Sequence, residues 1–128
     1  MREVVRTDRA PQPVGPYSQA VRAGDFVYVA GQGPADPATG KKVAGGVAAE
    51  TEQVLKNIQA ILEAAGCTMR DVVKTNVYLM HPGDFKEMNE VYARFFQEGP
   101  PARTTVQALP PVPILVEIDC VAYRPKGS

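Results

Sequence analysis

The segment from residue 114 to residue 123 alternates regularly enough to predict a β-strand with two chemically different faces. One face is wholly apolar and consists of Ile114, Val116, Ile118, Cys120 and Ala122. The other face mixes apolar with acidic side chains and consists of Leu115, Glu117, Asp119, Val121 and Tyr123. Because side chains alternate across a sheet, the apolar face suits packing beneath helices, while the mixed face needs a second cover. This strand therefore predicts a sheet that carries helices on one side.

Two amphipathic helices are predicted, over residues 47–65 and 84–97. The apolar stripe of the first consists of Val47, Val54, Leu55, Ile58, Ile61, Leu62 and Ala65. The stripe of the second consists of Phe85, Met88, Val91, Tyr92, Phe95 and Phe96. Both stripes predict core packing, and Glu50 is expected among the charged residues on the solvent side of the first helix.

The remaining alternating runs predict strands over residues 2–7, 17–23, 26–31, 70–80 and 103–106. A hairpin turn is expected at Gly24-Asp25, and Pro/Gly-rich loops are expected over residues 10–16 and 32–46. The order of elements predicts a single α+β domain over residues 1–128, with two helices on one face of a mixed sheet. The mixed face of the last strand is then a candidate for burial against another copy of the protein.

Composition narrows the classes of function. The chain has 128 residues, enough for one core, and its 14 Lys and Arg residues balance 14 Asp and Glu residues. No basic run exceeds the pair Lys41-Lys42, which counts against a dedicated nucleic-acid-binding protein. A net charge of zero also offers little electrostatic opposition to self-association.

Compartment and metal binding can be judged from a few residues. Residues 1–13 are charged rather than apolar, so we expect neither an export signal nor a membrane span. Cys67 and Cys120 are too few for a disulfide scaffold and predict reduced thiols in a cytoplasmic protein. The only histidine, His81, precedes a Pro-Gly turn, and without a Cys/His cluster we expect no metal.

Two charged residues interrupt strands where apolar side chains are the rule. Arg103 opens a β-branched run, and Glu117 interrupts the last strand. A guanidinium can bind a carboxylate through two hydrogen bonds, and a glutamate in apolar surroundings can move a proton or activate water. The pair therefore indicates a small pocket for an organic acid. The alternative is a salt bridge between Arg103 and Glu117 that closes a sheet edge.

Seven segments together resemble the RidA family of enamine/imine deaminases: PVGPYSQAV, FVYVAGQGPADPATG, ETEQVLKNIQAILEAAG, VVKTNVYL, MNEVYARFF, PPARTTVQ and VEIDCVAY. The resemblance covers about Ala10 to Tyr123, and PARTT followed by VEIDCVA is its most specific part. It implies a chorismate-mutase-like α+β fold and a homotrimer with active sites between adjacent subunits. It also implies cofactor-free hydrolysis of small 2-iminoacids, such as iminobutanoate and iminopropanoate, to 2-ketoacids and ammonia.

The resemblance also implies roles for individual residues. Arg103 matches the family arginine that binds the substrate carboxylate, and Glu117 matches the glutamate that positions and activates water. Tyr17, Gly31 and Asn89 match positions that line the cleft. For these three the structural alternatives are a strand cap, a β-bulge and an exposed helix position, respectively.

Two positions depart from many family members. Ala30 stands where a serine is common, which removes one hydroxyl contact to substrate or water. Thr105 stands where a cysteine is common, so a thiol nucleophile is not expected, although the Thr105 backbone can still face the ligand.

Two functions other than imine hydrolysis remain open at the level of the sequence. One is the RNA-cleaving or translation-inhibiting activity attributed to relatives, which the neutral charge disfavours. The other is a non-enzymatic trimer, either a holdase or a ligand sensor that keeps the pocket without turnover.

Overall fold

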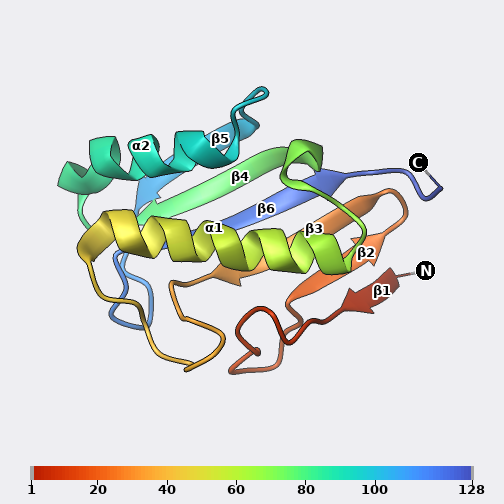
Figure 1. Ribbon diagram of the computed structural model, residues 1–128, viewed down its shortest axis with the longest axis horizontal. Helices are drawn as coiled ribbons and strands as arrows, with labels where there is room; N and C mark the ends of the chain where they lie inside the picture. The colour runs from red at the N-terminus through yellow and green to blue at the C-terminus, as the bar shows by residue number, and fades with distance from the viewer. Residues whose placement is uncertain (1, 128) are drawn as a thin grey trace.

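Both helices lie on the same face of one six-stranded mixed sheet (Figure 1). The computed structural model describes residues 2–127. The strands are β1 (Arg2–Val5), β2 (Ala20–Ala23), β3 (Phe26–Gln32), β4 (Val72–Leu79), β5 (Ala102–Gln107) and β6 (Val116–Tyr123). The helices are α1 (Gly46–Ala64) and α2 (Phe85–Phe95), and short 3₁₀ turns η1 (Met69–Asp71) and η2 (Pro82–Asp84) precede β4 and α2. This arrangement confirms the predicted α+β fold.

The strand order across the sheet is β1-β2-β3-β6-β4-β5. Every neighbouring pair is antiparallel except β4 and β5, which are parallel. A parallel pair needs a crossover connection, and α2 supplies it. The last strand in sequence, β6, therefore lies inside the sheet between β3 and β4, with β5 at one edge.

The two faces of β6 differ as the sequence predicts. The alternate residues Val116, Ile118, Cys120 and Ala122 are all buried beneath the helices. On the opposite face Glu117, Asp119 and Val121 are only half-buried, and Tyr123 is exposed. Phe26 and Tyr28 of β3 extend this open face, with the Phe26 and Tyr123 rings 5.0 Å apart. Large apolar side chains thus remain uncovered within one chain.

The predicted stripe of α1 is confirmed, with every member buried except the half-buried Ala65. The prediction for Glu50 is wrong, because its side chain is only 2% exposed. Its Oε1 accepts the backbone N–H of Leu115 at 2.7 Å, so the carboxylate satisfies a donor in the segment that enters β6. In α2 the predicted stripe holds at four positions, whereas Phe95 is half-buried and Phe85 is exposed.

Several strands are shorter than predicted, because side chains take over the backbone hydrogen bonds at their ends. The predicted strand 17–23 starts only at Ala20, since Gln19 faces inward and bonds to the backbone. Its Oε1 accepts from the Thr7 N–H, and its Nε2 donates to the carbonyls of Thr7, Ala10 and Pro11. The last strand likewise starts at Val116, because residues 111–113 and 115 form bends and Glu50 accepts the Leu115 N–H.

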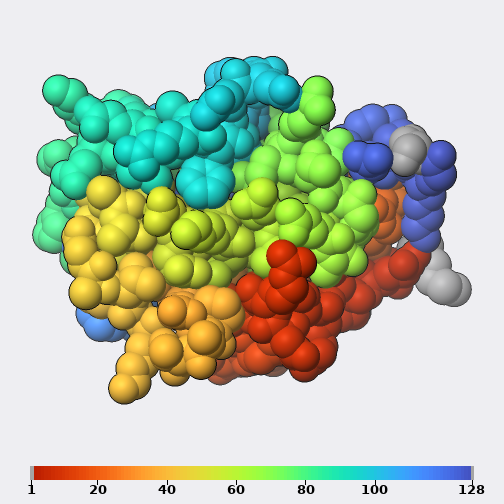
Figure 2. Space-filling view, in the orientation of Figure 1, coloured from red at the N-terminus to blue at the C-terminus, as the bar shows by residue number. Residues whose placement is uncertain are grey.

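The N-terminal segment and the loop after β3 pack along one side of α1 (Figure 2). Arg9 Nη2 donates to Glu63 Oε1 at 2.9 Å, which ties the N-terminal segment to the end of α1. Cys67 and Cys120 are free, as predicted, and both are buried; burial raises the pKa of the Cys120 thiol to about 12. His81 lies in an exposed turn before η2, again as predicted.

Candidate active site

Glu117 borders a hollow of about 660 Å³ at the end of β3 and the start of β6, together with Tyr17, Ala30 and Gly31. The walls are the Pro-rich segments 11–14 and 111–114. The phenol oxygen of Tyr17 accepts the Val14 N–H at 3.3 Å, and half of Tyr17 is exposed toward solvent. The structure therefore brings Glu117, Tyr17 and Gly31 together, and Ala30 lies beside them.

Gly31 lies in a β-bulge, which was the structural alternative for this residue. Between Val29 and Gln32 the pairing of β3 with β6 shifts by one residue, so Gln32 is buried while Gly31 is exposed. A Cβ atom at Gly31 would lie 2.2 Å from Glu117 Oε2. The glycine thus gives the Glu117 carboxylate its place against the backbone of β3.

The walls of the hollow are held by buried polar residues whose part in the site was not predicted from the sequence. Asn57 of α1 donates from Nδ2 to the carbonyls of Gly33 and Ala35, at 3.1 and 2.9 Å. Glu50 holds Leu115 from the same helix, and Gln19 holds the segment at residues 7–11. Glu50 and Asn57 are seven residues apart, on the face of the apolar stripe. A polar residue within an apolar stripe was the signal that could have identified them.

The surroundings of Glu117 favour its protonated form. Burial raises the pKa of Glu117, and the nearby charge of Asp119 raises it further. Asp119 is itself held by Asn76 Nδ2 and by the Tyr78 hydroxyl, each at 2.8 Å. Neither a hydrogen bond nor an ion pair to Glu117 is present among residues 2–127. The carboxylate is therefore available to a bound water or ligand.

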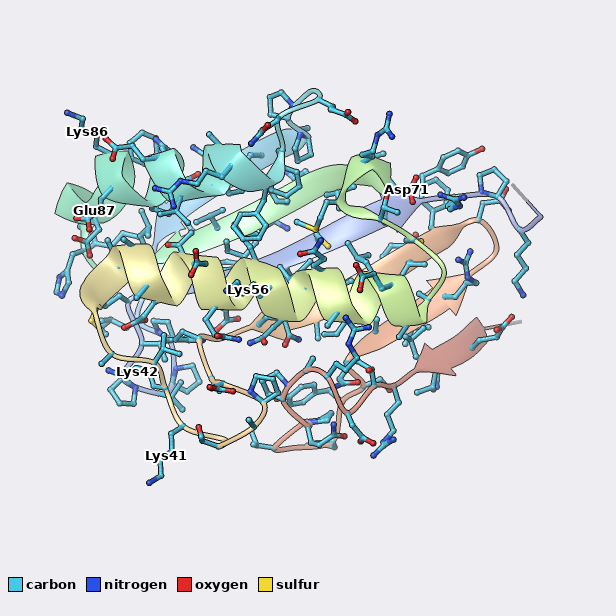
Figure 3. The ribbon with its side chains drawn as sticks, in the orientation of Figure 1. Lys41, Lys42, Lys56, Asp71, Lys86 and Glu87 are labelled. Atoms are coloured by element: carbon cyan, nitrogen blue, oxygen red, sulfur yellow. The ribbon has the colours of Figure 1, made fainter. Side chains whose placement is uncertain are left out.

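The ammonium group of Lys42, which lies at this hollow, already has a hydrogen-bond partner. Lys42 lines the same hollow, and its Nζ donates to the carbonyl of Pro113 at 3.1 Å. Figure 3 shows Lys42 close to the body of the molecule, whereas Lys41 points away from it. Figure 3 also shows Lys56 on α1 and Lys86 beside Glu87 at the start of α2, so these two lysines lie on different helices.

Arg103 lies on β5, and its guanidinium carbon is 4.8 Å from the centre of the Tyr92 ring and 5.6 Å from that of Phe85. In the part of the chain that the structure describes, Arg103 forms no ion pair. Thr105 follows two residues later on the same face of β5 and is half-buried. The donors of the Arg103 fork are thus not bound to a carboxylate of the same chain.

Asn89 belongs to the same region as Arg103. It lies on α2 four residues after Phe85 and three before Tyr92, so all three share one helix face. Its Oδ1 is buried, with no hydrogen-bond partner among residues 2–127. An exposed position, the structural alternative for Asn89, does not describe this buried amide oxygen. The structure therefore brings Arg103, Thr105 and Asn89 together.

These two groups of residues lie on opposite faces of the sheet. On β4, Thr75 pairs with Arg103, and the Thr75 Oγ1 contacts the Tyr92 hydroxyl of α2 at 2.7 Å on the helix side. Tyr78, three residues later and therefore on the other face, pairs with Glu117. The alternative of a salt bridge between Arg103 and Glu117 is wrong within one chain.

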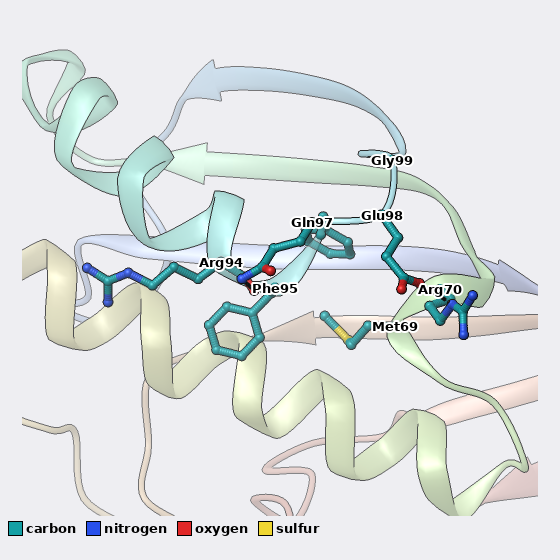
Figure 4. A pocket seen from close by; sticks show the side chains of 8 residues that line it. Met69, Arg70, Arg94, Phe95, Gln97, Glu98 and Gly99 are labelled. Atoms are coloured by element: carbon teal, nitrogen blue, oxygen red, sulfur yellow. Dashed lines mark hydrogen bonds and ion pairs between the residues drawn. The ribbon is translucent and has the colours of Figure 1, made fainter.

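A second hollow, of about 680 Å³, lies at the C-terminal end of α2 (Figure 4). It is lined by Met69, Arg70, Arg94, Phe95, Phe96, Gln97, Glu98 and Gly99. Arg70 and Glu98 form an ion pair with each other there, and none of the predicted site residues reaches it. The predicted chemistry therefore does not lie in this second hollow.

Neither membrane nor metal features stand out within residues 2–127. No helix there combines the length and apolarity needed to cross a bilayer. No group of three or more His, Cys, Asp or Glu side chains there is arranged to hold a metal ion.

The mixed sheet, with both helices on one face and polar groups at β5 and β6, has the chorismate-mutase-like fold. Residues 7–124 match the family model described as Endoribonuclease L-PSP. With this match over most of its length, the chain belongs to the RidA family.

Individual relatives resemble the chain over nearly its whole length. A RutC family protein of Pyrococcus horikoshii is 52% identical, over 97% of this chain and 99% of its own. The human 2-iminobutanoate/2-iminopropanoate deaminase is 46% identical, over 97% of this chain and 91% of its own. The crystal structure of E. coli TdcF with bound serine superimposes with a TM-score of 0.91 at 37% identity, covering 95% of this chain and 98% of that one.

Proposed function

We propose that this protein hydrolyses small 2-iminoacids to 2-ketoacids and ammonia. The observation that carries the proposal is the Arg103 guanidinium, held against two rings with no carboxylate partner among the described residues. A planar fork left open in this way suits a carboxylate bound through two hydrogen bonds. The human relative carries the name of this activity, and the TdcF relative binds serine, an amino acid with a carboxylate.

The complete site would be assembled from two copies of the chain. Arg103 and Glu117 lie on opposite faces of the sheet, so one chain cannot present both to a small molecule. In the proposed homotrimer, Glu117, Tyr17 and Gly31 of one subunit would face Arg103, Thr105 and Asn89 of its neighbour. The exposed aromatic side chains on the open face supply apolar surface for that contact.

The reaction needs orientation and one mobile proton. Arg103 binds the substrate carboxylate, and Glu117 accepts a proton from a water that attacks the electrophilic imine carbon. The substrate reacts as the protonated imine, so when the new C–O bond forms, the π electrons of the C=N bond go to the nitrogen, which becomes a neutral amine. Glu117 then donates its proton to this nitrogen, the C–N bond breaks and ammonia leaves. The hydroxyl loses its proton to solvent water to form the ketone. The raised pKa of Glu117 makes its carboxylate a stronger proton acceptor than an ordinary glutamate, which suits a group that takes a proton from water.

Asn89, Tyr17 and Thr105 would complete the contacts to substrate. The buried Oδ1 of Asn89 has no partner among residues 2–127, so it can accept a hydrogen bond from the ligand. Tyr17 would flank the substrate from the Glu117 side, and Thr105 would contribute its backbone rather than a nucleophile. The absent hydroxyl at Ala30 leaves water positioning to Glu117. Two free thiols support a cytoplasmic location.

The first experiment measures ammonia release from 2-iminobutanoate generated in situ by a threonine dehydratase. Added protein should accelerate ammonia release, and Arg103→Ala and Glu117→Gln should each abolish most of that acceleration. Wild-type protein that leaves the spontaneous rate unchanged would contradict the proposed activity. The same result would favour a non-enzymatic role.

The second experiment tests the shared site by combining the two inactive variants. Arg103→Ala and Glu117→Gln chains with different tags are co-expressed, and hybrid complexes are purified through both tags. In a hybrid cyclic trimer, one of three contacts pairs an intact Arg103 with an intact Glu117, so about one third of wild-type activity should return. A site within one chain predicts no recovery.

A further inference from the structure

Arg103 rests on a shelf of two aromatic rings. The shelf consists of Phe85 at the start of α2 and Tyr92 two turns later, and the Arg103 guanidinium carbon lies over both rings. The distances of 5.6 and 4.8 Å to the ring centres are within the range at which a cation is attracted to an aromatic face. The fork of Arg103 has no acidic partner among residues 2–127, so its electrostatic partners are the two rings and the Tyr92 hydroxyl.

One half of the shelf is fixed rigidly to the sheet. Tyr92 is only 5% exposed, and its ring lies 4.7 Å from that of Phe96. The Tyr92 hydroxyl and Thr75 Oγ1 are 2.7 Å apart, and Thr75 pairs with Arg103 across β4 and β5. The strand that carries Arg103 and the ring beneath its guanidinium are therefore both anchored to the same residue of β4.

The other half of the shelf has no role in the core. Phe85 belongs to the predicted apolar stripe of α2, yet its side chain is 46% exposed. Its ring lies against a charged group rather than among core residues. An aromatic ring beside a long, flexible arginine restricts the conformations of that arginine, whatever its contribution to folding.

We propose that Phe85 and Tyr92 are positioning residues that hold the Arg103 guanidinium in place before substrate arrives, and so set the affinity for the substrate carboxylate. This inference rests on the proposed function, because it assigns the carboxylate to Arg103. Binding is tighter when a side chain is already ordered in its bound conformation, since less freedom is lost on association. The shelf acts on binding and not on the proton transfer at Glu117.

Phe85→Leu tests the shelf at its exposed half, where folding is least at risk. We expect the Kd for 2-ketobutyrate and the KM for iminoacid to rise by about two- to fivefold, the range for an exposed cation–π pair, with kcat unchanged. Phe85→Tyr keeps the ring and should retain most of the affinity. Phe95→Leu, the same change on the same helix but beside the other hollow, serves as the control and should bind 2-ketobutyrate like wild type.

A double-mutant cycle separates the shelf from a structural effect. If Phe85 acts through Arg103, Phe85→Leu should lower kcat/KM in the wild-type background but add nothing in the Arg103→Ala background. An equal loss in both backgrounds, or an unchanged KM and Kd in Phe85→Leu, would overturn the shelf. If wild-type protein neither binds 2-ketobutyrate nor releases ammonia, the proposed function fails instead, so the two failures are distinguishable.

Discussion

Replacement of Gly31 by alanine should separate activity from stability. The new Cβ would lie 2.2 Å from Oε2, 3.0 Å from Cδ and 3.3 Å from Cγ of Glu117. Favourable carbon contacts begin near 3.5 Å, so the carboxylate would have to move by about 1 Å or more. The atoms in conflict belong to the end of a flexible side chain, so the backbone of β3 can stay where it is.

Gly31→Ala should lower the rate of catalysis much more than it lowers the stability of the fold. A displacement of about 1 Å can lower a rate about 10²-fold, which corresponds to about 2.7 kcal/mol of transition-state stabilisation. The free energy of unfolding should change by less than about 1 kcal/mol, because alanine restricts the unfolded chain while Glu117 adopts a less favourable rotamer. Gly31→Ala should therefore melt like wild type and turn over about 100-fold more slowly.

The assay compares ammonia release, 2-ketobutyrate affinity and melting temperature on the same preparation. Gly33→Ala is the matched control, because its Cβ would meet Ile114 Cδ1 at 3.5 Å, an ordinary contact, and wild-type turnover is expected. Gly31→Ala with full kcat/KM would refute the argument that Gly31 fixes the position of Glu117. A large drop in melting temperature would refute the argument that only the side chain moves.

Four further predictions concern the charged groups and the assembly. Arg103→Ala should lose about 30- to 1,000-fold in kcat/KM, and Arg103→Lys should also be badly impaired because it lacks the fork; near-normal ammonia release by Arg103→Ala would contradict this. Glu117→Gln should lose about 10²-fold in turnover, yet its melting temperature at pH 7 should stay equal or rise. The folded-state pKa of Glu117 is raised, so its ionisation opposes folding as pH increases through that pKa. Glutamine cannot ionise and removes this effect. A clearly lower melting temperature of Glu117→Gln would indicate a structural role for Glu117 instead. Asp119→Asn removes a charge that raises the pKa of Glu117, so the acidic limb of the pH–rate profile should move to lower pH, and an unmoved limb would count against Glu117 as the base. Light scattering at micromolar concentration should give about three subunit masses, and a stable monomer would rule out the shared site.

Local periodicity accounts for the parts of the fold that the sequence could predict. The apolar face of residues 114–123 is buried in the structure, and so is the apolar stripe of α1 apart from the half-buried Ala65, because a face of period 2 or 3.6 is encoded within the segment itself. The two charges in strands, Arg103 and Glu117, also lie where a ligand could reach them. Both are only partly buried, and no ion pair occupies either among residues 2–127.

Features that depend on pairing between strands could not be predicted in this way. The opposite orientation of Arg103 and Glu117 follows from the register of β5 and β6 on β4, which no single segment specifies. The bulge at Gly31 likewise requires the extra residue of β3 to be counted against β6. Glu50 was misjudged for a related reason, since its partner is a backbone N–H 65 residues away.

The two buried thiols, Cys67 and Cys120, can report local unfolding of the protein through their rates of reaction with a thiol reagent. Cys120 lies in the middle of the sheet on β6, with a pKa raised to about 12, and Cys67 lies just beyond the end of α1, with a pKa also raised by burial. A thiol reagent attacks the thiolate, so neither cysteine should react while its surroundings remain closed. Labelling at Cys120 would follow disruption of the sheet, whereas labelling at Cys67 would also record fraying of the helix end. The ratio of the two rates would show how independently α1 detaches from the strands beneath it.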